Sequence, residues 1–205
     1  MNSSRKSWVA IAVMSLAMLL VAGATPPSCS STAQVKEEPA KLEDSAGKAV
    51  SAAQAAMKGT APDAVPIMVS TGGVSLSPPP QQWSVMMFSP STKKSYSVAV
   101  SHAKAETPRE LGELPLSDAD VAGAIPYGSL KVGSDQAYEK AKAALAKSGE
   151  VPPQLMMNIT LLKLEGLPDT APAVWRLSFM QGTSREGSRK ATVDARTGAT
   201  AEQPQ

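Results

Sequence analysis

The sequence predicts an α+β fold made of two units, each with one helix and a three-stranded antiparallel sheet. The order helix, strand, strand, strand occurs twice, at 44–105 and at 134–199. In both units a tryptophan, Trp83 or Trp175, lies at the start of the second strand, as its second residue. Apolar residues make up 42% of the chain but aromatic residues only 4%, which indicates a mainly aliphatic core.

The N-terminus has the pattern of a secretory signal peptide. Arg5 and Lys6 precede an apolar run at 8–21, and the small residues Ala22, Gly23 and Ala24 follow it. We therefore expect residues 1–24 to be removed by cleavage after Ala24, which places the mature chain in the periplasm or outside the cell. The alternative is an uncleaved membrane anchor that holds the same domain outside the membrane.

Cleavage changes the charge balance of the chain. It removes two of the 20 basic residues and none of the 18 acidic ones, so the formal charge falls from +2 to zero. A neutral exported chain gives no electrostatic reason to expect a nucleic-acid partner.

Cys29 is the only cysteine, so the chain forms no internal disulfide. Its position just after the signal suits a bacterial lipoprotein, and Ser28 fits that pattern, whereas Pro26 and Pro27 do not. Two interpretations therefore remain, a lipidated cysteine that anchors an outer-membrane lipoprotein and a free thiol. Residues 25–43 are rich in polar residues and predict a flexible leader. Membrane contact is expected only through a lipid on Cys29 or an uncleaved signal.

The first unit, 44–105, begins with a helix that Asp44 or Ser45 can cap and that ends before Gly59. Its apolar face recurs at helical spacing in Ala46, Val50, Ala53 and Met57. Alternating apolar residues then predict three strands. These strands cover 65–70, 82–88 and 95–102.

A proline-punctuated connector at 106–133 separates the units, and Ser117 predicts a short helix over 118–124. The second unit, 134–199, repeats the order of the first. Its helix is expected at 134–149, its strands at 154–164, 174–180 and 189–195, and a loose tail at 200–205.

Several positions of the two units can be matched. Val50, Ala53 and Met57 correspond to Tyr138, Ala141 and Leu145, and Trp83-Ser84-Val85 corresponds to Trp175-Arg176-Leu177. Element order and the two tryptophans therefore favour a duplication. The alternative is two unrelated α+β halves, and the pattern leaves open whether the strands form one sheet or two.

Two stretches carry a resemblance to a known family. They are Gly133-Ser134-Asp135-Gln136-Ala137-Tyr138-Glu139-Lys140-Ala141 and Val193-Asp194-Ala195-Arg196-Thr197-Gly198. Over about 133–199 the chain resembles a PepSY-type domain, whose pattern is an alanine-bearing helix, strands and a closing turn of this kind. The first unit resembles it less, because Val100-Ser101-His102-Ala103-Lys104 lacks the aspartate and the glycine.

The resemblance implies a binding module. PepSY domains occur in exported and envelope proteins, including protease propeptides, and are thought to bind or inhibit, with no catalytic residues to carry over. It implies a protein or peptide partner in the cell envelope, bound by sheet surface or by an exposed edge strand, and no cofactor. From the residues themselves, we expect Asp194 and Thr197 to bond backbone groups of the closing turn and Gly198 to take a positive φ.

No residue pattern points to catalysis or to a metal site. His102 is the only histidine and is expected to face solvent near a strand end. Met86-Met87 and Met156-Met157 lie on predicted strands, so the members of each pair face opposite sides and fill core rather than bind copper. Trp83 and Trp175 are either core residues or exposed interface anchors. The competing hypothesis is an envelope structural or assembly lipoprotein held by Cys29.

Overall fold

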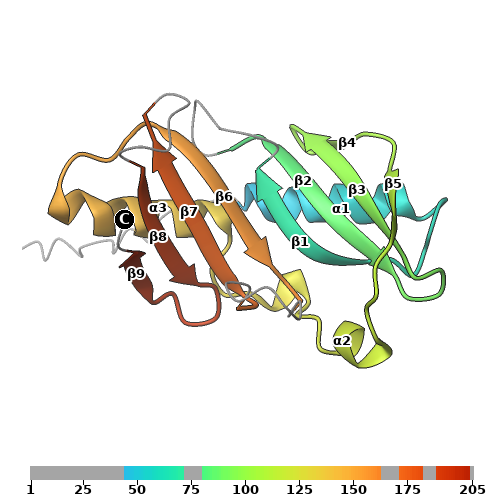
Figure 1. The fold of residues 1–205 in the computed structure, drawn as a ribbon. Coiled ribbons are helices and arrows are strands. Elements are labelled where there is room, and N and C mark those ends of the chain that lie inside the picture. Colours follow the sequence, from blue (N-terminus) through green and yellow to red (C-terminus); the bar gives the residue numbers. More distant parts are fainter. Residues whose placement is uncertain (1–43, 72–79, 163–170, 182–187, 204–205) are drawn as a thin grey trace, which may run out of the picture. The chain divides into compact units, whose positions relative to one another are not determined.

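The computed structural model describes residues 44–71, 80–162, 171–181 and 188–203 (Figure 1). Over these ranges the protein has three α-helices and one nine-stranded antiparallel sheet, so the predicted α+β class is confirmed. None of the described helices is long and apolar enough to cross a membrane. The predicted signal peptide and leader lie outside the described residues.

The first predicted helix and three strands are present. They are α1 (Ser45–Met57), β1 (Val65–Thr71), β2 (Gln82–Ser89) and β3 (Lys94–Ser101). Two further strands, β4 (Lys104–Ala105) and β5 (Arg109–Glu113), pair with β3. The sequence did not predict them, because they are short and their side chains are mostly exposed, so they show no apolar alternation.

The second half follows the same order. It consists of α3 (Ser134–Leu145), the 3₁₀ turn η2 (Ala146–Ser148), β6 (Gln154–Thr160), β7 (Val174–Met180) and β8 (Arg189–Asp194). The strand expected at 154–164 is shorter than predicted, since it ends at Thr160. The expected loose tail is also wrong: β9 (Thr200–Gln203) pairs with β8 and bonds backbone groups that would otherwise be open at the sheet edge.

All nine strands belong to one sheet, which answers the question that the sequence left open. The order is β4-β3-β2-β1-β6-β7-β8-β9, and β5 also pairs with β3. The first strand of each half forms the centre, where β1 and β6 pair antiparallel with Val69 opposite Ile159. The two halves therefore share a hydrogen-bonded seam.

Helices α1 and α3 cover the same face of this sheet and share one hydrophobic core (Figure 1). Both helices bury the same pattern of positions, at a constant offset of 88 residues. In α1 these are Ala46, Ala49, Val50, Ala53 and Met57, and the matching positions of α3 are Ser134, Ala137, Tyr138, Ala141 and Leu145. Helix α3 also buries Asp135, whose counterpart Gly47 is half-buried. The matches proposed from the sequence for the two helices hold at each position.

A second, smaller core lies on the opposite face. It contains Ile67, Phe88 and Leu162. The connector covers it with four apolar side chains, Leu114, Leu116, Val121 and Ala124, in and around α2 (Asp118–Ala122). As predicted, Ser117 caps α2, and it forms a capping box with Asp120. The connector therefore packs on the sheet as well as linking the two halves.

Trp83 and Trp175 lie in the main core. Their exposed fractions are 2% and 0%, and their rings meet edge to face with centroids 6.4 Å apart. Each indole N–H has a backbone partner, 3.2 Å from the Pro80 carbonyl for Trp83 and 2.9 Å from the Val132 carbonyl for Trp175. The interpretation as exposed interface anchors is therefore wrong for both, because they point to the face that the helices cover.

Replacing Trp175 by alanine should lower the free energy of unfolding by about 3–5 kcal/mol, because it opens a large cavity in the shared core. Urea unfolding followed by circular dichroism measures this. The control is Met156→Ala, on a side chain that is 41% exposed, and it should cost less than about 1 kcal/mol. Equal unfolding midpoints for the two variants would contradict the burial of Trp175.

Candidate binding surface

One row of side chains crosses the sheet on the face opposite α1 and α3. We call this face the open face and this row the central row. Strand register joins its members in the order Ala99, Ser84, Ser70, Asn158, Arg176, Thr192, Ala201. All are half-buried or exposed. With strands about 4.8 Å apart, the row is about 29 Å long, and it consists of small or polar side chains with one arginine.

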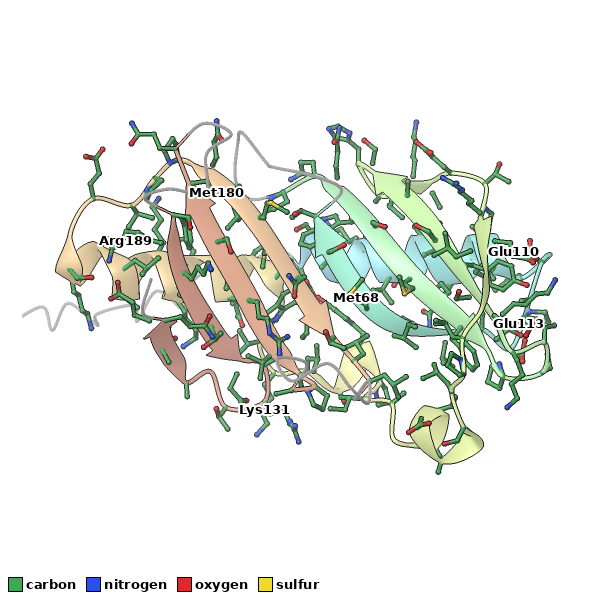
Figure 2. All side chains as sticks on the ribbon, viewed as in Figure 1. Met68, Glu110, Glu113, Lys131, Met180 and Arg189 are labelled. Atoms are coloured by element: carbon green, nitrogen blue, oxygen red, sulfur yellow. The ribbon has the colours of Figure 1, made fainter. Side chains whose placement is uncertain are left out.

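Methionines flank the central row on the same face. Met68 and Met86 are cross-strand partners on one side, where Met86 packs against the smaller core of Ile67, Phe88 and Leu162, and Met156, 41% exposed, lies on the other. Their chain neighbours Met87 and Met157 are buried in the main core. The predicted alternation of each methionine pair is therefore correct, but only one member of each pair fills the main core, and Figure 2 shows Met68 near the centre of the sheet.

The sheet edges are less suited to a partner than the open face. The outer strands β5 and β9 have only five and four residues and carry charged side chains. Glu110 of β5 is 2.8 Å from Lys94, and Glu202 of β9 is 2.8 Å from Arg189. Short, charged edge strands discourage pairing with another chain.

The closing turn has the bonds that the sequence predicts. The Asp194 carboxylate accepts the backbone N–H groups of Arg196 and Thr197, both at 2.8 Å. Thr197 Oγ1 accepts the N–H of Ala199 at 3.2 Å, and Gly198 has a φ of +78°. The bond from Thr197, followed by that from Arg196, lowers the pKa of Asp194. These bonds fix the conformation of the turn.

The N-termini of α1 and α3 meet and cap each other. Asp44 Oδ1 accepts the Ser134 N–H at the start of α3 at 3.1 Å, and Ser134 Oγ accepts the Ala46 N–H of α1 at 3.1 Å. Ser45 Oγ donates to Asp135 at 2.6 Å. Asp44 or Ser45 was expected to cap α1. Asp44 is the N-cap residue, but its side chain makes no capping bond to α1 and bonds Ser134 of α3 instead. We call this group of side chains the helix junction.

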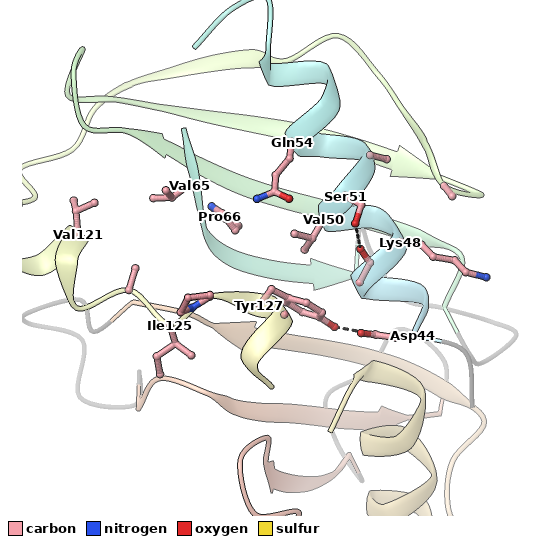
Figure 3. Close-up of a pocket in the computed structure, with 16 residues that line it drawn as sticks. Asp44, Lys48, Val50, Ser51, Gln54, Val65, Pro66, Val121, Ile125 and Tyr127 are labelled. Carbon is pink, nitrogen blue, oxygen red and sulfur yellow. Dashed lines mark hydrogen bonds between the residues drawn. The ribbon is translucent and has the colours of Figure 1, made fainter. Parts of the chain in front are cut away.

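Tyr127 closes the helix junction from the connector, in the short 3₁₀ turn η1 (Tyr127–Ser129). Its hydroxyl donates to Asp44 Oδ1 at 2.8 Å (Figure 3). Burial, and then the nearby Asp44 carboxylate, raise the pKa of Tyr127 far above its usual range, so the hydroxyl stays protonated and keeps donating. No sequence signal links these residues, since Asp44 and Tyr127 are 83 positions apart.

A cavity of about 1070 Å³ lies beside the helix junction, between α1, the start of β1 and the connector (Figure 3). Its apolar wall includes Val50, Val65, Pro66, Val121 and Ile125. Its polar side chains include Ser51 and Gln54 of α1, and Ser51 bonds the Gly47 carbonyl. Among the described residues that line the cavity there is no histidine or cysteine that could pair with the Ser51 hydroxyl.

His102, Ala24 and Cys29 are the remaining residues that the sequence analysis singled out. His102 is exposed, has a φ of +49° in the turn after β3 and lies 3.0 Å from Ser101 Oγ. The described residues contain no group of three or more histidine, cysteine, aspartate or glutamate side chains placed to hold a metal ion. Ala24 and Cys29 lie outside the described residues, so signal cleavage and lipidation stay predictions.

Comparisons with protein-family models, curated proteins and solved structures found no match to this chain. The open face, the sheet edges and the N-terminal sequence are therefore the basis on which a function is proposed.

Gly133→Ala should destabilise the protein by about 1–3 kcal/mol, because the new Cβ would lie 2.6 Å from Asp44 Cγ and displace that carboxylate from the helix junction. Gly128→Ala is the matched control, since nothing lies within 4 Å of its Cβ position. Urea unfolding of both variants measures the difference. Equal stability would show that the helix junction contributes little.

Asp194→Ala should destabilise the protein by about 1 kcal/mol at pH 7, where the carboxylate holds the closing turn. Because the folded-state pKa is lowered from the usual 3.8, this stabilisation is complete above that value and is lost as the pH falls through the folded pKa. Urea unfolding at pH 7 and pH 2.5 should therefore show the variant and the wild type converging in acid. Glu106→Gln, at an exposed carboxylate, serves as the control. A pH-independent difference would argue against this role for the ionised carboxylate.

Proposed function

We propose that this chain is an exported, non-enzymatic binding module of two PepSY-like units, which takes a protein or peptide partner of the cell envelope on the open face of its sheet. Occupying a partner's surface in this way would suit inhibition of an envelope or secreted protein. Export follows from the N-terminal pattern that ends at Ala24.

The observation that carries this proposal is the composition of the open face. Its centre combines small hydroxyl and amide side chains with Met68 and Met156, all half-buried or exposed. Flexible thioether side chains adapt to the shape of a partner and are common on binding surfaces. Both edges, by contrast, are short and charged. Of the two binding modes expected from the sequence, these features favour the sheet face.

Three features support the tandem arrangement. The buried positions of α1 and α3 match at one offset, each helix packs on the strands of its own half, and β1 pairs with β6 at the seam. The bonds of Asp194 and Thr197 in the closing turn agree with the motif on which the PepSY resemblance rests.

Met68→Glu combined with Met156→Glu should reduce partner capture at least about tenfold, because the two carboxylates place unpaired charge within the apolar part of the contact. The mature chain is cross-linked in envelope extract, and captured proteins are quantified by mass spectrometry. Circular dichroism first establishes that the variant is folded. Leu111→Glu is the matched control, on the other described large apolar side chain that is exposed, in edge strand β5.

Each alternative gives a different result. Loss of capture by the Leu111→Glu variant alone would show that the partner contacts the edge strand β5 and not the open face. Equal capture by all chains would exclude the open face. A folded wild-type chain that captures no protein would refute the binding function, and a lipid found on Cys29 would then favour the structural lipoprotein.

A further inference from the structure

We infer that the open face binds an acidic, extended polypeptide segment that crosses the strands along the central row. The inference rests on the proposed function and adds the chemical class of the partner to it.

Exposed basic side chains stand on the open face at both ends of the central row. Lys104, Arg109 and Lys190 are register partners of serines in β3 and β7 that point away from the helices. All three are exposed, and none forms an ion pair with a described residue. Arg176 lies between them in the row and donates to the carbonyls of Val174 and Ala171.

Acidic strand residues lie mainly on the other side of the sheet. Glu110 is opposite Tyr96, and Glu202 is opposite Ala191, both of which face the main core. Glu113 is opposite Lys94 and shares that side, and Figure 2 shows Glu110 and Glu113 together on β5. Among the described strand residues, Asp194 alone places a carboxylate on the open face, and two backbone N–H groups already bond it.

The strands therefore separate their charges, although the mature chain is expected to be neutral. The positive side of the sheet complements an acidic partner. At about 3.3 Å per residue, an extended segment of about nine residues spans the 29 Å row, and the hydroxyl and amide groups of Ser70, Ser84 and Asn158 can bond its peptide groups. The basic residues are single and widely spaced, and the central row contains no aromatic ring for base stacking, so a polypeptide fits better than a nucleic acid or a lipid surface.

The test is a selection of random decapeptides displayed on phage against the mature full-length chain. Peptides that bind the wild type should be enriched in Asp and Glu. Selected peptides should bind the variant K104E/R109E/K190E at least about tenfold more weakly, and high salt should weaken their binding to the wild type. The control variant K131E/K142E/K147E makes the same charge change at exposed lysines off the open face and should bind them like the wild type.

The outcomes separate this inference from the proposed function. Peptides that bind without an excess of acidic residues, or equally well to both triple variants, would overturn the acidic partner and leave a binding module. Binding to vesicles with anionic lipid, without acidic peptides, would replace the partner by a membrane surface. A folded chain that enriches no peptide at all would count against both proposals.

Discussion

The reciprocal capping of α1 and α3 is the constraint on which the arrangement of the two halves depends. The first N–H groups of any helix lack partners within that helix, and here side chains of the opposite helix supply them. Asp44 and Asp135 also place carboxylates where the two positive helix ends meet. The pairing of β1 with β6 makes the same connection in the sheet, and the two tryptophans pack in the core shared by both layers. Neither half can move without breaking bonds in both layers.

The elements that face the core could be predicted from the sequence, because burial imposes a period on their side chains. The apolar face of α1 and the alternation in β2 and β7 are direct examples. The outer strands β5 and β9 could not be predicted in this way. Most of their side chains are exposed on both faces of the sheet. These strands are therefore defined by backbone pairing with β3 and β8, and backbone pairing imposes no pattern of apolar residues on the sequence.

The binding surface was only partly accessible from the sequence. Alternation showed that Met86 and Met156 face away from Met87 and Met157, but the central row exists only because β1 pairs with β6 in one register. The helix junction was hidden for the same reason, since Asp44 and Ser134 are 90 positions apart. For Trp83 and Trp175 the sequence position was known, but the environment of the side chain was not. Their residue type suits both a core and an interface, and only the side on which the helices lie decides between them.

The small core of Ile67, Phe88 and Leu162 makes the two halves of the open face different. If the two halves were identical, a partner could bind in two equivalent orientations related by a rotation of half a turn about the central seam. The connector covers this core with Leu114 and Leu116 beside β1, β2 and the end of β6, whereas the closing turn at Asp194 follows β8. The two halves of the open face therefore differ in shape, so a segment bound along the central row would favour one of the two directions.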